Sequence, residues 1–142
     1  MTSNIYTAVC MANYCRSPVA QHLLKHRFTN LNFDSAGIQP ISRPHMDRRS
    51  EKFLKSLSID GLQHFPKRIS KKIISNSKVV FALDPMVLMQ LNKMFPNESK
   101  KFLLLNYKDS KNIIYDPYTM DDDSYMDVMK NIQNIVENLD LD

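Results

Sequence analysis

Short apolar runs alternate along this chain with segments of helical periodicity, and that alternation limits the fold more than any other feature. Candidate strands occupy residues 5–9, 31–37, 77–84 and 101–106, and the first of them is rich in β-branched residues. Strands that alternate with helices predict a parallel sheet that is covered by helices on both faces and connected by right-handed crossovers. In such sheets, ligands bind beyond the carboxyl ends of the strands.

Four segments have the spacing of apolar residues that is typical of amphipathic helices. We expect the first to begin at Ser17, with the Ser17 hydroxyl as its N-terminal cap and Pro18 in its first turn. The others follow Pro44, begin at Pro85 and occupy residues 122–139. We expect their apolar residues, including the frequent methionines, to fill the core. Those residues are Val19, Leu23, Leu24, Phe28, Met46, Phe53, Leu54, Leu57, Met86, Leu88, Met89, Leu91, Met126, Met129, Ile132, Ile135 and Val136.

The composition argues against a membrane protein, a secreted scaffold or a nucleic-acid-binding protein. The net charge of +4 comes from scattered lysines rather than from a dense basic run, so no nucleic acid partner is expected. No apolar run approaches the roughly 18 residues of a membrane span, and the N-terminus lacks the pattern of a secretory signal. The two cysteines are too few for a disulfide scaffold. We therefore expect a cytoplasmic protein without a membrane span.

The loop between the first strand and the first helix, from Cys10 to Arg16, is the strongest candidate for chemistry. A loop that opens onto a helix N-terminus presents unpaired N–H groups and the positive end of the helix dipole, which together attract an anion. Arg16 adds a planar fork that matches two oxygens of a tetrahedral oxyanion. A cysteine in such a field favours its thiolate, so Cys10 could displace an ester oxygen from phosphorus through a covalent phosphocysteine. The candidate phosphate-binding residues are Met11, Ala12, Asn13, Tyr14, Cys15, Arg16 and Ser17.

Other roles for the cysteines stay open from these residues alone. A buried cysteine is commonly just a small apolar residue. A structural zinc ion would need more cysteines or histidines at ligand spacing, and the histidines do not supply a recognisable set. These histidines are His22, His26, His45 and His64. Neither a metal nor an organic cofactor is therefore expected.

Residues 9–20, VCMANYCRSPVA, resemble the phosphate-binding signature V-C-x-G-N-x-C-R-S-P-x-A of the low-molecular-weight protein tyrosine phosphatases. The resemblance extends over nearly the whole chain, through DSAG at 34–37, HFPKRIS at 64–70, ALD at 82–84 and YDPY at 115–118. In agreement with the alternation of strands and helices, it implies a single α/β domain over residues 1–142. The implied architecture is a four-stranded parallel sheet of flavodoxin-like order 2-1-3-4 with helices on both faces.

The resemblance implies roles for five residues in the hydrolysis of phosphotyrosine. Cys10 matches the nucleophile, and Arg16 matches the arginine that grips the phosphate. Ser17 matches the hydroxyl that stabilises the thiolate. Asp116 matches the general acid that protonates the phenolate leaving group and then deprotonates the attacking water. Cys15 either packs under the loop or forms a reversible disulfide with Cys10 that guards it against further oxidation.

The resemblance also implies a set of residues that support the loop. Asn13 matches an asparagine that is held in a left-handed conformation, which asparagine tolerates better than most residues. The side chain of Asn13 would be tied by Ser17, Ser35 and His64.

Several positions depart from the family pattern, and HFPKR at 64–68 stands where the family has His-x-Ala-Arg-Gln. Ala12 replaces a glycine of the loop, and it keeps the backbone N–H but not the torsions that glycine permits. Lys67 stands where the family has an arginine, and it could pair with Asp34 without a bidentate fork. Tyr14 is bulkier than the aliphatic residue that tyrosine phosphatases usually carry there.

The substrate pocket is expected to lie between Tyr118, whose ring would stack on a phenyl phosphate, and Ile41 on the opposite wall. Tyr14 could narrow its entry. The segment 38–46 has a length that resembles a shorter bacterial branch of the family, which acts on tyrosine kinases of capsule and exopolysaccharide export. Such a kinase is therefore a candidate substrate.

Together these features predict a protein tyrosine phosphatase that has a phosphotyrosyl protein as its substrate and inorganic phosphate or vanadate as small ligands. Three alternatives stay open: a protein-arginine phosphatase, an arsenate reductase of the same fold, and a catalytically weak module that binds phosphopeptides or oxyanions. Arginine phosphatases carry a threonine where Tyr14 stands. Arsenate reductases relay electrons through downstream cysteines, and no cysteine follows Cys15.

Overall fold

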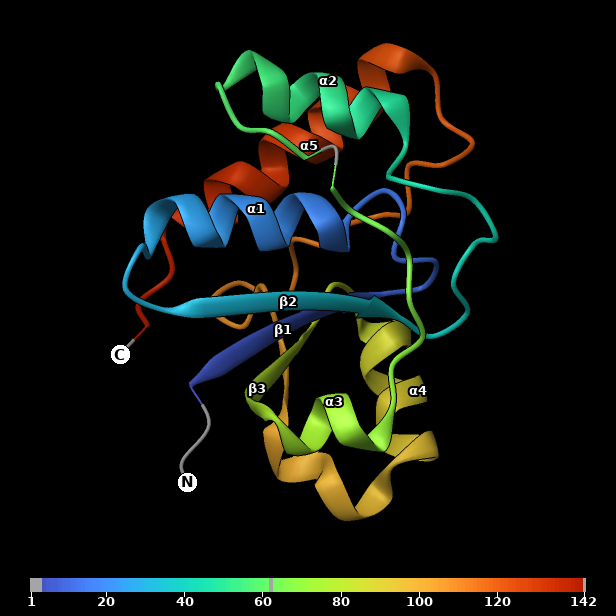
Figure 1. Cartoon of the computed structure of the whole chain (residues 1–142), viewed down its shortest axis with the longest axis vertical. Helices are drawn as coiled ribbons and strands as arrows, with labels where there is room; N and C mark the ends of the chain where they lie inside the picture. Colours follow the sequence, from blue (N-terminus) through green and yellow to red (C-terminus); the bar gives the residue numbers. More distant parts are fainter. Residues whose placement is uncertain (1–3, 62, 142) are drawn as a thin grey trace.

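Four parallel strands form the central sheet of the computed structural model, which describes residues 4–61 and 63–141. They are β1 (Ile5–Cys10), β2 (Asn32–Gly37), β3 (Ser77–Ala82) and β4 (Phe102–Leu104). Their order in the sheet is β2-β1-β3-β4 (Figure 1), which confirms the order expected from the sequence. β1 therefore lies inside the sheet, and its last residue, Cys10, pairs with Gly37 at the end of β2.

Helices lie on both sides of this sheet (Figure 1). On one side lie α1 (Ser17–Arg27), α2 (Arg48–Ser56) and α5 (Asp122–Glu137). On the other side lie α3 (Lys71–Ser75), α4 (Pro85–Met94) and the 3-10 helix η1 (Pro96–Lys101). The α/β fold with both faces covered is thus confirmed, although the short helices α3 and η1 were not expected.

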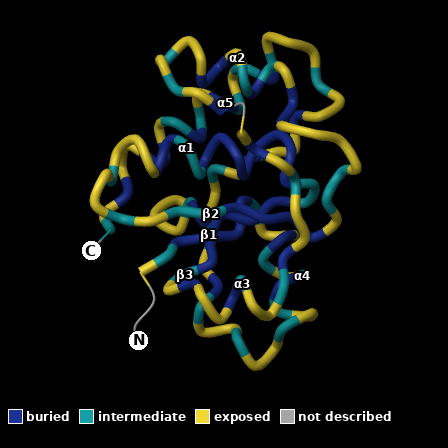
Figure 2. Tube along the Cα trace, viewed as in Figure 1, coloured by how far each residue is buried: buried dark blue, intermediate teal, exposed yellow. Residues whose placement is uncertain are grey.

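The side chains of β1 alternate between two cores, one on each face of the sheet. Tyr6, Ala8 and Cys10 belong to the core beneath α1 and α5, whereas Val9 belongs to the core beside α3 and α4. The strand is buried along most of its length (Figure 2). Because Cys10 ends a buried inner strand, the sheet fixes its position on the α1 side.

Ser17 does not cap α1, so this part of the sequence prediction is wrong. Arg16 occupies the N-cap position, no described side chain caps the helix there, and Ser17 is the first helical residue. The Ser17 hydroxyl instead lies 3.0 Å from the Cys10 sulfur and accepts a hydrogen bond from the Asn13 amide at 2.8 Å. Pro18 lies in the first turn as expected, where its missing N–H costs no helical hydrogen bond.

Helix α2 starts later than expected. Its first residue is Arg48, and the side chain of Asp47 caps it by accepting from the N–H of Arg49 at 2.9 Å. Met46 is buried just ahead of the helix rather than on its apolar face. The cap formed by Asp47 therefore sets the beginning of this helix.

The apolar face of α4 also differs from the prediction. Val87 and Leu91, one turn apart, are buried, whereas Met86 and Met89 are 59% and 58% exposed. Positions four residues apart share one side of a helix, and that side faces the sheet. The prediction that methionines fill the core is therefore right for a residue such as Met129 and wrong for these two.

Helix α5 is the longest helix, with 16 residues. Its buried residues are Tyr125, Met129, Ile132, Ile135 and Val136, and all but the tyrosine were predicted to face inward. Met126, which was also predicted to face inward, is only partly buried. No helix in the described part of the chain, this one included, combines the length and apolarity needed to span a membrane.

Candidate active site

The loop between β1 and α1 turns at Asn13, which adopts a left-handed conformation with φ of 53°. Asparagine enters this region of backbone torsions more readily than most residues. The side-chain amide of Asn13 donates hydrogen bonds to the hydroxyls of Ser17 at 2.8 Å and Ser35 at 3.0 Å. Asn13 is itself fully buried, so these bonds fix the curvature of the loop from inside.

His64 and Lys67 hold Asn13 from the other side. Nε2 of His64 lies 2.8 Å from the backbone carbonyl oxygen of Asn13, so His64 reaches the main chain rather than the side chain. The side-chain oxygen of Asn13 accepts instead from the N–H of Lys67 at 2.9 Å. Burial lowers the pKa of His64, which favours a neutral ring that donates from Nε2. At the surface, Nζ of Lys67 pairs with Asp34 at 2.6 Å, as the sequence predicted.

Gly37 allows the loop to lie directly against the end of β2. A Cβ atom at Gly37 would meet the backbone nitrogen of Asn13 at 2.9 Å and the carbonyl carbon of Ala12 at 3.0 Å, which leaves no room for a side chain. The carbonyl oxygen of Ala12 accepts from the N–H of Ile41 at 3.2 Å. Among the described residues, Ala12 is not one of those with positive φ, so alanine replaces the family glycine here without a strained torsion.

Cys10 is 2% exposed, and its sulfur lies 3.0 Å from the Ser17 hydroxyl. The thiol therefore sits at the end of β1 with a hydrogen-bond donor from the first turn of α1 beside it.

Arg16 is buried and is held by two acceptors. Its Nη1 donates to Oδ2 of Asp84 at 2.7 Å and to the carbonyl oxygen of Ile114 at 2.7 Å. Burial by itself lowers the pKa of this guanidinium, but Cys10 and Asp84 outweigh burial and raise the pKa, so the group stays charged. Both bonds use Nη1, which leaves the Nε and Nη2 edge of the fork for two oxygens of an anion.

Asp84 is a site residue that the sequence analysis did not identify. Its Oδ1 accepts from the N–H of Val87 at 2.8 Å and so caps α4, while its Oδ2 binds Arg16. The position of Asp84 just beyond β3, at the carboxyl edge of the sheet, was a usable signal. An aspartate before Pro85 is also an ordinary helix start, and that explanation hid its second role.

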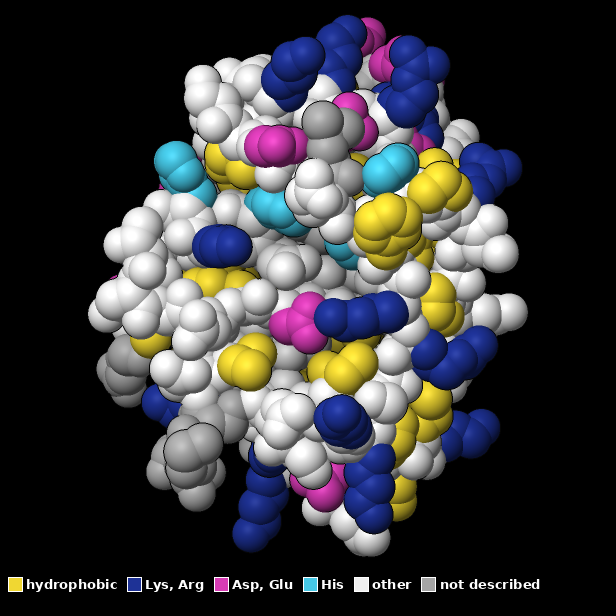
Figure 3. Space-filling view, in the orientation of Figure 1, with side chains coloured by type: hydrophobic (Ala, Val, Ile, Leu, Met, Phe, Trp, Pro, Cys, Tyr) yellow, Lys and Arg dark blue, Asp and Glu magenta, His cyan; other side chains and the backbone are white. Residues whose placement is uncertain are grey.

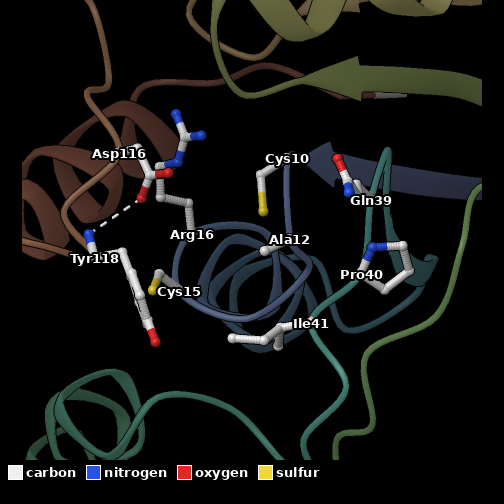
Figure 4. Close-up of a pocket in the computed structure, with 9 residues that line it drawn as sticks. All are labelled: Cys10, Ala12, Cys15, Arg16, Gln39, Pro40, Ile41, Asp116 and Tyr118. Atoms are coloured by element: carbon white, nitrogen blue, oxygen red, sulfur yellow. Dashed lines mark hydrogen bonds between the residues drawn. The ribbon is translucent and has the colours of Figure 1, made fainter.

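A cavity of about 290 Å³ includes the Cys10 thiol in its lining (Figure 4). Asp116 and Tyr118 lie on one side of the thiol, and Ile41 lies on the other side with the two residues before it (Figure 4). Of these, Gln39 and Pro40 were not predicted. The described residues that line the cavity are Cys10, Ala12, Cys15, Arg16, Gln39, Pro40, Ile41, Asp116 and Tyr118.

Tyr14 is not among the described residues that line this cavity. It is only 8% exposed, and its ring packs edge-to-face against Tyr118 with the centroids 6.1 Å apart. Tyr14 therefore supports the wall formed by Tyr118.

Asp116 lies at the exposed rim of the cavity. Its Oδ1 accepts from the backbone N–H of Tyr118 at 3.1 Å (Figure 4). This hydrogen bond closes a turn that holds the carboxylate beside the guanidinium of Arg16. The carboxylate thus lines the same cavity as the Cys10 thiol.

Residues 6–140 match the protein family described as "Low molecular weight phosphotyrosine protein phosphatase". The chain belongs to this family. The low molecular weight protein-tyrosine-phosphatase Wzb of Escherichia coli (strain K12) is 29% identical over 120 residues, which cover 83% of this chain and 80% of the relative.

Two solved structures share the fold of this low molecular weight phosphatase. Vibrio vulnificus Wzb in complex with benzylphosphonate matches with a TM-score of 0.88 and 20% identity over 96% of both chains. The YwlE arginine phosphatase from Geobacillus stearothermophilus matches with a TM-score of 0.86 and 22% identity, over 94% of this chain and 88% of the other.

In this phosphatase, Arg49 connects the loop that carries Asp116 to α2. The guanidinium binds Asp47 twice, each time at 3.0 Å, and donates to the carbonyl oxygens of Tyr118 at 3.0 Å and Met120 at 2.8 Å. The sequence analysis missed Arg49, because an arginine in the first turn of a helix gives no sign of distant carbonyl partners. The rim of the cavity is therefore held by a side chain that does not line it.

Cys15 is buried, and its surroundings keep it protonated. Burial raises the pKa of the Cys15 thiol to about 12. The carbonyl oxygen of Cys15 accepts from the Ser50 hydroxyl at 2.8 Å, and that hydroxyl lies 2.5 Å from the hydroxyl of Tyr125. Cys10 and Cys15 are both free thiols here, so the guard role of Cys15 stays a prediction.

The described residues contain no group of three or more histidine, cysteine, aspartate or glutamate side chains placed to hold a metal ion. Positive charge toward an anion in the cavity comes from Arg16 and from the N–H groups at the start of α1.

Proposed function

We propose that this chain is a protein tyrosine phosphatase that acts through a phosphocysteine on Cys10. One observation carries the proposal: Cys10, Arg16 and Asp116 line the same cavity, although they come from a strand end, a helix start and a distant loop. The displacement at phosphorus needs a thiolate nucleophile, a cation for the phosphoryl oxygens and a proton donor for the leaving group. These three side chains supply those three groups.

In the first step, the sulfur of Cys10 attacks phosphorus, and the bond between phosphorus and the tyrosine oxygen breaks. The electron pair of that bond goes to the phenolic oxygen, which takes a proton from Asp116. Arg16 and the loop N–H groups hold the remaining phosphoryl oxygens while negative charge builds on them.

In the second step, a water molecule attacks the phosphorus of the phosphocysteine and gives a proton to the carboxylate of Asp116. The bond between phosphorus and sulfur breaks, and sulfur leaves as a thiolate that the hydroxyl of Ser17 stabilises from 3.0 Å. Inorganic phosphate departs, and both Cys10 and Asp116 return to their starting states.

The walls of the cavity support an aromatic phosphoester as the substrate. The Tyr118 ring and the Ile41 side chain stand on opposite sides, so a flat ring can stack between them. Inorganic phosphate and vanadate present oxygens in the same arrangement as the phosphoryl group of the substrate but carry no aromatic ring. Both should therefore bind at the loop as inhibitors.

The natural substrate in this proposal is a phosphotyrosyl protein in the cytoplasm. A tyrosine kinase of bacterial capsule or exopolysaccharide export is the specific candidate. The length of the segment 38–46, which resembles the bacterial branch of the family, supports that choice.

Arginine dephosphorylation is the principal alternative, since an arginine phosphatase has the same fold. The pair of rings formed by Tyr14 and Tyr118 favours an aromatic substrate instead. Thioredoxin-coupled arsenate reduction is disfavoured, because no cysteine follows Cys15 to carry the electrons.

A panel of phosphopeptides tests the proposal. The wild-type protein should release phosphate from a phosphotyrosine peptide much faster than from matched phosphoarginine or phosphoserine peptides. Cys10→Ser should abolish release while vanadate still binds, and Asp116→Asn should slow release about 10²-fold to 10⁴-fold. Faster release from phosphoarginine would favour the arginine phosphatase, and efficient arsenate turnover with thioredoxin would favour the reductase. Tight binding of phosphotyrosine peptide without release would leave only a binding module.

A further inference from the structure

The outward side of α2 carries a row of basic residues. Arg48, Lys52 and Lys55 follow the spacing i, i+4, i+7, which places them on one side of a helix. All three are exposed, whereas Phe53 and Leu54 are buried on the other side. Figure 3 shows Lys and Arg side chains gathered at the end of the molecule where α2 lies.

These basic residues line a second cavity of about 670 Å³. Arg43, from the segment before α2, and Tyr14, from the loop after β1, line it as well. Within the described part of the chain, the two cavities have no lining residue in common. The ring of Tyr14 nevertheless packs on Tyr118, which lines the cavity of Cys10, so the two cavities adjoin at this pair of rings.

The second cavity has an excess of positive charge. Arg49 pairs with Asp47 at 3.0 Å and lies 3.9 Å from Asp122, so this group of one cation and two carboxylates carries one net negative charge. Glu51 is the remaining acidic residue of the lining. Four further cations line the cavity: Arg43, Arg48, Lys52 and Lys55. None of the four forms an ion pair within residues 4–61 and 63–141, so positive charge remains in excess.

Arg43 brings this charge to the border between the cavities. A hydrogen bond to Tyr14, together with the nearby Tyr118, raises the pKa of Arg43. Its guanidinium thus reaches the same two rings that separate the cavities.

An extended peptide advances about 3.3 Å per residue. With a phosphotyrosine above Cys10, a residue a few positions along the peptide would therefore reach the second cavity. A neutral side chain gains little from a surplus of cations there, whereas an anionic side chain is attracted.

We propose that the second cavity is a subsite for another anionic side chain of the substrate, a carboxylate or a second phosphate, a few residues from the target phosphotyrosine. The proposal rests on the proposed function, because it requires a peptide held at Cys10. It defines the substrate class as phosphotyrosine segments with acidic or multiply phosphorylated flanks.

Four substrates test the subsite. Para-nitrophenyl phosphate reports on the Cys10 cavity alone. Three matched phosphotyrosine peptides carry, on both sides of the target, either alanines, glutamates or a second phosphotyrosine. We expect kcat/KM to be about threefold to tenfold higher for at least one anionic peptide than for the alanine peptide, with the gain lost at high salt. A gain for the doubly phosphorylated peptide alone would identify phosphate as the preferred anion, and a gain for both would extend the subsite to carboxylates.

A triple variant, Arg48→Gln with Lys52→Gln and Lys55→Gln, should abolish that preference without changing the hydrolysis of para-nitrophenyl phosphate. The matched control is Lys71→Gln with Lys72→Gln and Lys93→Gln, which removes the same charge from exposed positions on the other side of the sheet. The control should keep the preference.

Equal kcat/KM for all three peptides, or equal loss of the preference in both triple variants, would overturn the subsite and leave the proposed function standing. Failure to hydrolyse any peptide or para-nitrophenyl phosphate would overturn the proposed function instead. In that case, calorimetric binding of the three peptides to the Cys10→Ser protein would still decide the subsite, since equal affinities would contradict it.

Discussion

The carboxylate of Asp84 binds Arg16 and caps a helix at the same time. Oδ2 accepts from Nη1 of Arg16 at 2.7 Å, and Oδ1 accepts from the N–H of Val87 at 2.8 Å. Arg16 and Asp84 are 68 positions apart, and parallel strands bring them together at one edge of the sheet. The orientation of the phosphate-binding guanidinium therefore depends on the start of α4.

Asp84→Asn should separate these two roles. An asparagine can still cap α4 through its side-chain oxygen, but a neutral amide no longer attracts the guanidinium of Arg16. We expect kcat/KM for an aryl phosphate to fall about 10-fold to 100-fold, because the phosphate is less well oriented. Inhibition by inorganic phosphate should weaken in parallel, while the thermal midpoint changes little.

Asp84→Ala is the control for the cap. It should lose the same activity and also lower the free energy of unfolding by about 1 kcal/mol relative to Asp84→Asn. Wild-type affinity for phosphate in Asp84→Asn would mean that Arg16 needs no carboxylate partner.

Arg49 should act on catalysis through the position of Asp116. Arg49→Gln removes the donors to the carbonyl oxygens of Tyr118 and Met120, so the rim loop loses its support. We expect kcat to fall about 10-fold for phenyl phosphate, whose leaving group needs a proton, and less for para-nitrophenyl phosphate. Arg49→Lys should restore only part of the activity, because lysine lacks the planar fork.

A double-mutant cycle checks that this effect runs through the acid. Once Asp116→Asn has removed the proton donor, adding Arg49→Gln should have little further effect on kcat. Fully additive losses, or equal losses for the two aryl phosphates, would show that Arg49 only stabilises the fold.

The sequence correctly indicated the strands and helices that the pattern of neighbouring residues determines. The strand before Cys10 and the helix after it follow from neighbouring residues, whereas the left-handed Asn13 was implied by the family resemblance, and the structure has all three. Local pattern misled at Ser17, where a serine before proline is typical of a cap. Its hydroxyl lies 3.0 Å from the Cys10 sulfur instead, a position that the family resemblance indicated and the local pattern did not.

Two sets of contacts between distant segments were beyond the sequence. The bond from Arg16 to Asp84 and the bonds from Arg49 to the loop near residue 118 join residues about 70 positions apart. Nothing in either local sequence distinguishes these side chains from ordinary helix-end charges. The exposed face of α4 was missed for a related reason. Apolar residues occur on all sides of this helix, so only its packing against the sheet shows which of them are buried.

His64 should make the fold less stable in mild acid. Burial lowers the pKa of His64 in the folded protein, while an unfolded histidine has a pKa of about 6.5. Below that value the unfolded chain binds a proton that the folded protein does not, so stability falls as the pH drops through about 6.5. We expect the urea midpoint to decrease from pH 7.5 to pH 5.5, and to decrease less in His64→Gln. An identical decrease in both proteins would rule out His64 as the source.

Cys15 should stay unreactive in the folded protein. Burial raises the pKa of its thiol to about 12, so very little thiolate is present at pH 7.5. In a Cys10→Ser background, iodoacetamide should label Cys15 about a thousandfold more slowly in the folded than in the urea-unfolded protein. Peptide mapping by mass spectrometry measures the two rates, and rapid labelling of the folded protein would contradict the assignment.

The covalent intermediate on Cys10 is the central claim, and rapid-quench mass spectrometry tests it most directly. Wild-type protein mixed with a phosphotyrosine peptide and quenched within milliseconds should carry one phosphoryl group, mapped to the peptide that contains Cys10. The Cys10→Ser protein should carry none and release no phosphate. Phosphate release by Cys10→Ser at the wild-type rate, with no phosphoenzyme in either protein, would contradict the mechanism.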